Sequence, residues 1–494
     1  MMWRDKSDVR RWGFWCILFV VFFFLCGLRV SAKRLLWNDE VFTAALARVP
    51  DVRTLWRAIA DYADSMPFGY HLLIRATTRI FGYSALALRL PSAVALAAGM
   101  LLTFDCARRL TSGFHAMISL ALLGCSFVRF YGYEARPYTL IFAIASFCLW
   151  LWLFVDESWL SALAFGFAAF LAVAMHLYAV VLIVPYAVYE ILRTKSIPVT
   201  SRRLVAGGIG TLGGTLLACQ HIFAGLEGVR ISSRIPAISW APPTFQALEQ
   251  VWTDCVPIAA LALVLLVLSF ALWRAEKPSM HEPMGDGERL CWMFLLVPLS
   301  GFALAIGITH IFHARYFIEV VPGIAVGTSC MLFRLCPNRR ILWGLLLLFL
   351  GLGLRSQVKA ALHPESIQSF GDYQTLAPGI IGMEPRFASE GKRYIVFSDD
   401  NNLCLVAWYY SAHRDRYAVV SRGPFALARY TADFNVWTPE ELLAHTDESA
   451  LVSPKPELTD YLLRAGLRVE VRAASPTVVV YTSRVNHSPN IALP

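Results

Sequence analysis

The sequence predicts a polytopic α-helical membrane protein with a soluble α/β domain at its C-terminal end. Of the 494 residues, 57% are hydrophobic and 16% are charged, and the mean hydropathy is +0.54, whereas soluble domains are about one quarter charged. Apolar runs of membrane-spanning length recur as far as residue 354. We therefore expect a membrane domain over residues 1–354 and a soluble domain over residues 355–494.

The first apolar run extends from Trp12 to Val30 and follows several basic residues. A run of about 20 residues is long enough to cross the hydrocarbon of a bilayer. Val30-Ser31-Ala32 also resembles a signal-peptide cleavage site, so a cleaved leader stays an alternative to the retained span that we favour. Both alternatives place Lys33 on the outer side of the membrane.

Ten further runs bring the expected number of spans to about eleven. The outer segment between the first and second spans, residues 33–86, is partly amphipathic and predicts interfacial helices near Val52–Tyr62 and Phe68–Phe81. The ten runs are Ala87–Cys106, His115–Phe130, Thr139–Val155, Trp159–Met175, Ala179–Leu192, Leu204–Phe223, Cys255–Trp273, Leu290–His310, Phe317–Phe333 and Leu342–Leu354.

Basic residues predict the orientation of these spans. Alternating spans place the basic connections near residues 108–109, 193–203, 274–289 and 334–340 on the N-terminal side, which is the cytoplasm by the positive-inside rule. The net charge of +9 therefore indicates topology rather than nucleic-acid binding. We expect a multi-pass protein of the plasma (inner) membrane, with its tail on the periplasmic or extracytoplasmic side.

The tail after residue 354 predicts a small α/β domain, which we interpret as a cap over the outer face. With Cys404 as its only cysteine, a disulfide framework there is excluded. Short segments rich in β-branched residues predict strands, and two segments between them predict helices. The strands are Tyr394–Ser398, Tyr417–Ser421, Ala450–Ser453, Leu467–Ala473 and Thr477–Thr482, and the helices are Leu403–His413 and Glu457–Ala465.

The adjacent carboxylates Asp39 and Glu40 emerge just beyond the first span. An acid at the membrane boundary is costly unless it is hydrogen-bonded or paired, so it is a candidate functional residue. The alternative is that Asp39 and Glu40 only begin a short interfacial helix, where acids favour the first turn.

Four other polar motifs fall on the same outer face as this pair. They are Asp64–Tyr70, the segment Phe81–Ser84 with Arg89–Ser92, Tyr133–Tyr138, and His313–Phe317. Together with Asp39-Glu40, these motifs resemble the GT-C glycosyltransferases of the protein O-mannosyltransferase and aminoarabinose-transferase type, in the bacterial branch with lipid-linked sugar donors. The resemblance covers roughly the whole membrane part.

The resemblance implies an inverting glycosyltransferase with a polyprenyl-phosphate sugar donor and a lipid, glycan or protein acceptor. Asp39 would be the general base, and Glu40 or Asp64 would orient the acceptor or tune that base. Arg136 and Arg315 would hold the departing phosphate, because the guanidinium fork matches its oxygens. Candidate substrate contacts are Tyr70, Glu134, Tyr138, His313 and Tyr316.

Several alternatives accompany these assignments. The two arginines can simply extend to lipid head groups, and the tyrosines can be interfacial belt residues. The pair His310 and His313 resembles metal ligands but is more often structural, so no cofactor is assigned and a divalent metal stays open. Ser65-Met66 replaces a basic-Pro pair of the family, and Glu319 stands where the family often has Pro.

Two other functions compete with a glycosyltransferase. A polytopic transporter typically shows internal repeats and midplane charges, whereas here no repeat is visible and the ionisable residues collect at one interface. An oligosaccharide polymerase or ligase is a further alternative, against which the acidic pair directly after the first span argues. Neither the sugar nor the acceptor is encoded in a recognisable motif.

Overall fold

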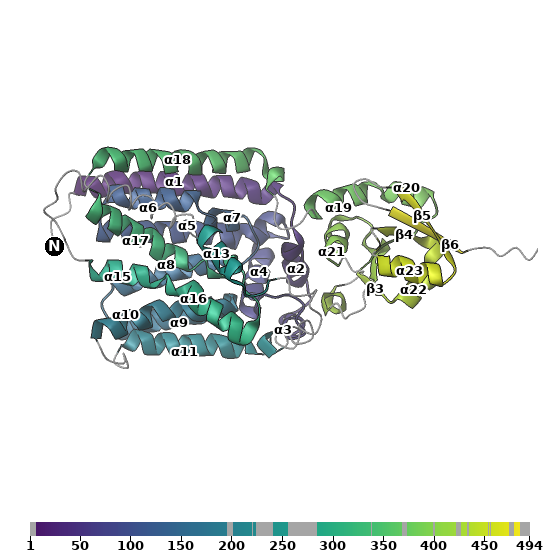
Figure 1. Cartoon of the computed structure of the whole chain (residues 1–494), viewed down its shortest axis with the longest axis horizontal. Coiled ribbons are helices and arrows are strands. Elements are labelled where there is room, and N and C mark those ends of the chain that lie inside the picture. Colours follow the sequence, from purple (N-terminus) through teal and green to yellow (C-terminus); the bar gives the residue numbers. More distant parts are fainter. Residues whose placement is uncertain are drawn as a thin grey trace, which may run out of the picture. The chain divides into compact units, whose positions relative to one another are not determined.

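The structure is a computed structural model, drawn as a ribbon in Figure 1. The predicted span Cys255–Trp273 lies outside the residues that it describes. It describes residues 6–194, 201–219, 221–223, 241–254, 284–336, 338–367, 373–398, 401–420, 426–431, 434–452, 454, 456–473 and 479–484.

The residues pack into two compact units that do not follow the order of the chain. The helical unit comprises Met1–Arg34 and Ser65–Ser366, and the sheet unit comprises Leu35–Asp64 and Ile367–Pro494. The segment that carries Asp39 therefore packs with the C-terminal residues. The predicted division of the chain at residue 354 stays a prediction.

Ten of the eleven expected spans coincide with helices of the helical unit, which confirms the predicted fold class. Some runs are divided: His115–Phe130 becomes α6 and α7, Ala179–Leu192 becomes η1 and α10, and Leu290–His310 becomes α15, α16 and the π-helix η3. The elements are α1 (Lys6–Lys33), α4 (Phe68–Phe81), α5 (Ala85–Leu110), α6 (Gly113–Cys125), α7 (Val128–Tyr131), α8 (Tyr138–Phe154), α9 (Trp159–Met175), η1 (Leu177–Ile183), α10 (Val184–Thr194), α11 (Arg202–Leu217), α13 (Phe245–Asp254), α15 (Asp286–Met293), α16 (Leu296–Leu304), η3 (Ala305–Thr309), η4 (Ala314–Phe317), α17 (Val320–Leu335), α18 (Arg339–Leu362) and η5 (Pro364–Ser366).

Length and composition make this a multi-pass membrane protein. Within the described residues, five helical stretches are long and apolar enough to cross a bilayer, and four shorter apolar helices accompany them. The five are Arg10–Lys33, Ala85–Leu110, Leu177–Thr194, Asp286–Thr309 and Arg339–Leu362.

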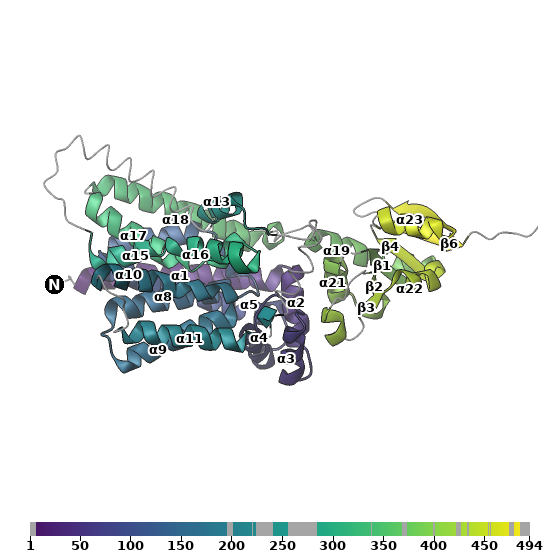
Figure 2. The same ribbon diagram turned by 60° about the horizontal axis from the view of Figure 1, so that its bottom comes forward.

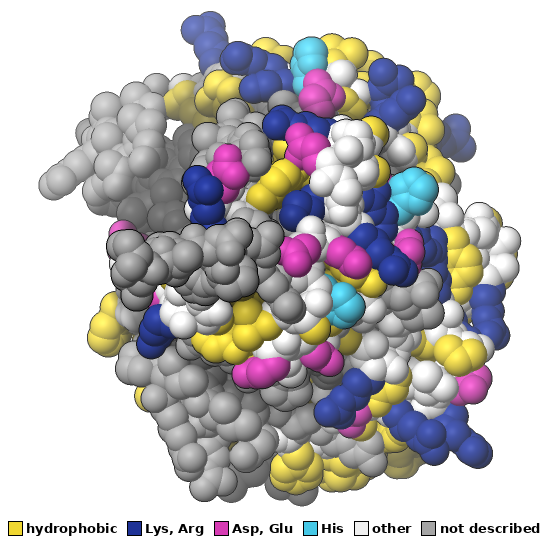
Figure 3. Space-filling view, turned by 90° about the vertical axis from the view of Figure 1, so that its right-hand side faces the viewer, with side chains coloured by type: hydrophobic (Ala, Val, Ile, Leu, Met, Phe, Trp, Pro, Cys, Tyr) yellow, Lys and Arg dark blue, Asp and Glu magenta, His cyan; other side chains and the backbone are white. Residues whose placement is uncertain are grey.

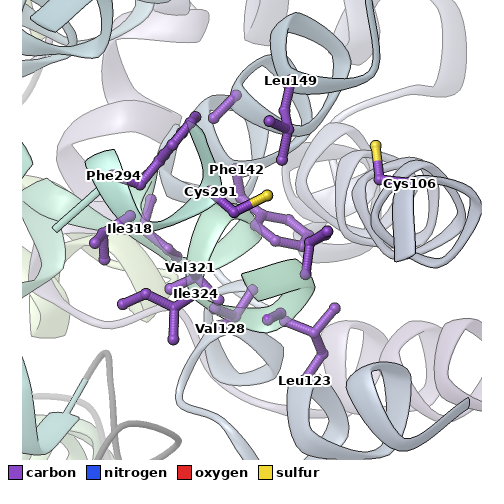
Figure 4. Close-up of a cluster of buried hydrophobic side chains, with 14 of the residues drawn as sticks. Cys106, Leu123, Val128, Phe142, Leu149, Cys291, Phe294, Ile318, Val321 and Ile324 are labelled. Carbon is purple, nitrogen blue, oxygen red and sulfur yellow. The ribbon is translucent and has the colours of Figure 1, made fainter. Parts of the chain in front are cut away.

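The helices of this unit pack side by side around one apolar core. Figures 1 and 2 show α1 beside α18 and α9 beside α11, and both pairs are in contact. In the interior, Phe142 of α8, Cys291 of α15 and Val321 of α17 are almost fully buried and face one another (Figure 4). Helices that are far apart in the sequence therefore share one apolar core (Figure 4).

The sheet unit contains a six-stranded sheet in the order β3-β2-β1-β4-β6-β5. The first four of these strands are parallel, and β6 is antiparallel to both of its neighbours. The strands are β1 (Tyr394–Ser398), β2 (Tyr417–Val420), β3 (Asn435–Trp437), β4 (Ser449–Val452), β5 (Leu467–Ala473) and β6 (Val479–Arg484). All five predicted strands are confirmed, and β3 is additional.

Short helices accompany the sheet, and α21 and α23 confirm the two helices that the sequence predicts. Thr438 begins α22 by accepting a hydrogen bond from the Glu441 N–H at 3.1 Å, and Pro439 occupies its first turn. The helices are α2 (Asn38–Ala47), α3 (Val52–Ala60), α19 (Tyr373–Gly382), α20 (Glu384–Ser389), α21 (Asn401–Tyr410), η6 (Arg414–Arg416), η7 (Ala426–Tyr430), α22 (Pro439–Ala444), η8 (Thr446–Glu448) and α23 (Pro456–Arg464).

Charged side chains are frequent on the surface of the sheet unit (Figure 3). Figure 3 shows basic and acidic side chains interspersed with apolar ones over the face that it draws. Exposed ion pairs such as Arg386–Glu390, at 3.1 Å, belong to this surface. A mixture of charges is typical of a surface in water, which agrees with a soluble domain.

Candidate active site

Part of the motif Phe81–Ser84 determines where two helices end and begin. Gly82, with φ of +81°, follows the last residue of α4, in a backbone region that favours glycine. Ser84 then begins α5 by accepting a hydrogen bond from the Ala87 N–H at 3.1 Å. These two residues therefore direct the chain from the interfacial helix into the span, and their role is structural.

Arg89 and Glu134 stabilise the end of α1. The buried Arg89 guanidinium donates hydrogen bonds to the carbonyl oxygens of Ser31 at 3.0 Å and of Arg34 at 2.8 Å. The side chain of Arg34 forms an ion pair with Glu134 at 3.4 Å, and both side chains are almost inaccessible to solvent. The geometry thus gives Glu134 a structural partner, and its predicted contact with substrate stays a prediction.

Arg136 and Tyr138 lie at the start of α8, and both are buried. The Ser92 hydroxyl donates to the Arg136 carbonyl oxygen at 2.9 Å, and the Thr139 hydroxyl donates to the Ser92 carbonyl oxygen at 2.9 Å. Ser92, the last residue of the motif Arg89–Ser92, therefore fixes the backbone that carries Arg136.

Arg315 and Tyr316, from the motif His313–Phe317, contact Tyr138 of the motif Tyr133–Tyr138. The Arg315 guanidinium carbon lies 5.6 Å from the ring centre of Tyr138 and 5.8 Å from that of Tyr316. The two tyrosine rings are stacked with their centres 6.4 Å apart. Cation–π contacts of this kind stabilise a guanidinium at the face of an aromatic ring, so the two tyrosines help to orient Arg315.

Glu319 is fully buried four residues beyond Arg315. Among the residues that the structure describes, neither of its carboxyl oxygens has a hydrogen-bond partner. We assign it no role.

His176 is a further member of this cluster that the motifs did not identify. It is the residue between α9 and η1, outside both helices, and its ring centre lies 4.9 Å from that of Tyr316 and 5.7 Å from that of Tyr138. Burial, together with the positive charges of Arg315 and Arg136, lowers the pKa of His176 to about 3. Arg136 lies two residues before Tyr138, whose ring contacts Arg315, so the two candidate phosphate ligands belong to the same part of the fold.

His313 lies at the edge of the same cluster. Its ring centre is 5.8 Å from that of Tyr316, and its Nδ1 accepts a hydrogen bond from the Arg315 N–H at 3.4 Å. Burial and the charge of Arg315 lower the pKa of His313 to about 3. No group of three or more metal-ligating side chains occurs among the described residues. These residues therefore provide no candidate set of ligands for a divalent metal, and the question of a metal stays open.

Tyr70 lies at the start of α4 and is fully buried. A Cβ on the preceding residue, Gly69, would lie 2.6 Å from the Ala174 carbonyl oxygen near the end of α9. Only glycine permits this approach, which places the start of α4 against the part of α9 that leads to His176. The Tyr70 ring also contacts the buried His71 at 5.5 Å between centres.

The acidic pair belongs to the sheet unit and lies in the first turn of α2. Asp39 is half-buried, whereas Glu40 is fully buried and accepts a hydrogen bond from the Trp37 N–H at 3.2 Å. Glu40 therefore caps the helix that carries Asp39. Asp64, at the end of the same segment, is also buried.

The comparisons with known proteins give one matching family model and similar solved structures. Residues 65–213, which include Arg136, Tyr138 and His176, match the family model described as dolichyl-phosphate-mannose-protein mannosyltransferase. A crystal structure of ArnT from Cupriavidus metallidurans in the apo state superposes with a TM-score of 0.59 and 14% identity, covering 95% of this chain and 98% of that one. The chain has the fold of a GT-C glycosyltransferase.

A second ArnT structure from Cupriavidus metallidurans, bound to undecaprenyl phosphate, gives a TM-score of 0.58 with the same 14% identity and the same coverage, 95% of this chain and 98% of that one. Among curated proteins, the comparison finds no match. The predicted resemblance to the GT-C glycosyltransferases of the mannosyltransferase and aminoarabinose-transferase type is thus confirmed.

The two histidines predict the direction of one pH dependence. The folded-state pKa of His176 and of His313 lies near 3, below the ordinary value of 6.5. Between these two pH values, the two imidazoles therefore take up protons in the unfolded chain but not in the folded one. The free energy of unfolding should therefore fall as the pH is lowered from 6.5 toward 3. We expect the melting temperature in detergent to decrease over this window, and to decrease less in His176→Gln.

An equal pH dependence in wild type and His176→Gln would show that the buried imidazole of His176 does not resist protonation.

Proposed function

We propose that this protein is a membrane glycosyltransferase that moves a sugar from a polyprenyl-phosphate donor to a lipid, glycan or protein acceptor on the extracytoplasmic side of the plasma (inner) membrane. The observation that carries the proposal is the contact of Arg315 with Tyr138 and Tyr316, since Arg136 lies only two residues before Tyr138. Two guanidinium groups in a buried aromatic setting suit a phosphate anion that is anchored in lipid.

The proposed reaction is a displacement at the sugar carbon. The acceptor hydroxyl or amine attacks the sugar carbon, the bond from that carbon to the phosphate oxygen breaks, and the phosphate leaves with the electron pair. Arg136 and Arg315 stabilise the negative charge that develops on the leaving phosphate. Asp39 takes the proton of the acceptor, and attack from the face opposite the phosphate inverts the sugar carbon.

The aromatic rings and the buried histidines complete the donor site. The rings of Tyr138 and Tyr316 contact the Arg315 guanidinium and would orient it for the phosphate. A neutral His176 adds no third positive charge and offers a hydrogen bond to the sugar or the phosphate.

Transfer from labelled donors tests this function. The purified full-length protein would be incubated with radiolabelled undecaprenyl-phosphate sugars and with separated lipid, glycan and protein fractions of bacterial membranes. We expect label to move into one of these fractions, and Asp39→Asn to abolish the movement. A transporter would instead carry the intact labelled lipid across proteoliposomes without releasing sugar, and that result would overturn the proposal.

A further inference from the structure

The segment that carries the candidate acids packs on the C-terminal residues. Residues 35–64 and residues 367–494 form one compact unit, in which α2 contacts α21 and both α2 and α3 contact η7. Eight of the ten residues of α2 are buried. The contacts at the two ends of the segment show how it is held.

At its N-terminal end, the backbone of the segment 35–64 is hydrogen-bonded to a side chain of α21. The N–H of Leu36, three residues before Asp39, donates a hydrogen bond to the Tyr410 hydroxyl. Leu36 is itself buried. Nearby, the Arg48 guanidinium carbon at the end of α2 lies 5.4 Å from the ring centre of Tyr409. The last turn of α21 thus contacts both ends of the helix that carries Asp39.

At the C-terminal end, the segment is bonded to η7. The Tyr430 hydroxyl donates a hydrogen bond to the Asp61 carboxylate, which also lies 3.6 Å from Arg429. Asp61 is three residues before Asp64, the alternative acid. Asp39 and Asp64 are therefore each three residues from a residue that is hydrogen-bonded to a tyrosine hydroxyl of the C-terminal region.

We propose that the C-terminal domain positions the catalytic carboxylate, with Tyr410 as the main positioning residue and Tyr430 as the second. Neither tyrosine touches the reacting atoms; each acts through the backbone of residues 35–64. A short helix such as α2 has little intrinsic stability in water, so its orientation depends on these contacts. The C-terminal domain is then part of the catalytic apparatus rather than a cap alone.

This inference rests on the proposed function for its kinetic readout, and hydrogen exchange tests the positioning separately. In Tyr410→Phe the ring remains, but the Leu36 N–H loses its acceptor. We expect faster amide exchange over residues 36–47 in the full-length protein, and in Tyr430→Phe faster exchange near residue 61. The control is Tyr481→Phe, which removes a hydroxyl that donates to Glu390; it should leave exchange over residues 35–64 unchanged.

The kinetic arm measures transfer with labelled undecaprenyl-phosphate sugar. Displacing a catalytic group by about 1 Å can cost as much as 10²-fold in rate, so we expect kcat to fall by about tenfold in Tyr410→Phe. The KM for the donor should not change, because the arginines that bind its phosphate belong to the helical unit. The acid limb of the pH–rate profile should also shift, which a general loss of folded protein would not produce.

Wild-type exchange over residues 36–47 in both Tyr410→Phe and the double variant Tyr410→Phe/Tyr430→Phe would overturn the positioning role. Faster exchange with unchanged kcat would overturn its contribution to catalysis. If exchange responds but the wild-type protein transfers no sugar, the proposed function fails and the structural contact stands. The two failures are therefore distinguishable.

Discussion

Asp39→Asn is expected to lower the transfer rate by about 10²–10⁴-fold, the usual contribution of general acid–base catalysis. The amide keeps the size of the side chain but cannot take the proton of the attacking acceptor. Asp39 is half-buried on α2, so it is accessible to an acceptor in a way that its fully buried neighbour is not. The measurement is kcat in purified variants that have matched melting temperatures.

Glu40→Gln is the matched control for this prediction. The Glu40 side chain accepts a hydrogen bond from the Trp37 N–H, and a glutamine oxygen can accept the same bond. We expect a much smaller fall in rate and at most a modest change in melting temperature. Near-wild-type turnover in Asp39→Asn would rule out Asp39 as the base, and Asp64, buried at the end of the same segment, would be tested next.

The helices were predictable because their signal is local. Helices α4 and α9 have the bounds that the sequence predicts, since each is a continuous apolar or amphipathic run between clear stop signals. Strand β3 was missed because it has three residues and no alternating pattern of its own. It exists because β2 offers it a parallel partner, which is a tertiary effect.

The candidate site was predictable only in part, because its contacts join distant parts of the chain. The motifs identified Arg136, Tyr138, Arg315 and Tyr316, and the structure brings Arg315 against the rings of both tyrosines. His176 was missed, although it is a polar residue between two apolar runs and so carried a usable signal. The ion pair of Glu134 with Arg34 joins residues 100 positions apart, which no local pattern can indicate.

The grouping of residues 35–64 with the C-terminal residues was not predictable at all. It depends on single contacts such as that between the Leu36 N–H and Tyr410, which are 374 positions apart. Composition shows only that the tail is soluble and that residues 33–86 are amphipathic. The same argument applies to the donor site, because Arg136 and Arg315 lie far apart in the sequence, and a direct test of their shared role follows.

Arg136→Ala and Arg315→Ala are each expected to lower kcat/KM for the lipid-phosphate donor by about 10- to 100-fold. A hydrogen bond to a charged group contributes about 1.5–3 kcal/mol, and both guanidinium groups are buried where water competes weakly. Lysine should restore only part of the loss, because it keeps the charge but lacks the planar fork. For Arg315→Lys the cation–π contacts with Tyr138 and Tyr316 also weaken.

Binding of undecaprenyl phosphate to the purified protein measures the same contact without turnover. Arg79→Ala is the matched control, since Arg79 is exposed near the end of α4 and lies outside this cluster. If the arginines hold the phosphate, both alanine variants should bind the lipid more weakly than wild type and Arg79→Ala should not. If all three variants bind undecaprenyl phosphate with the affinity of the wild type, Arg136 and Arg315 do not hold the donor phosphate. They would then contact lipid head groups in general, and a side chain that only anchors the protein at the membrane surface does not change the affinity for one particular lipid phosphate.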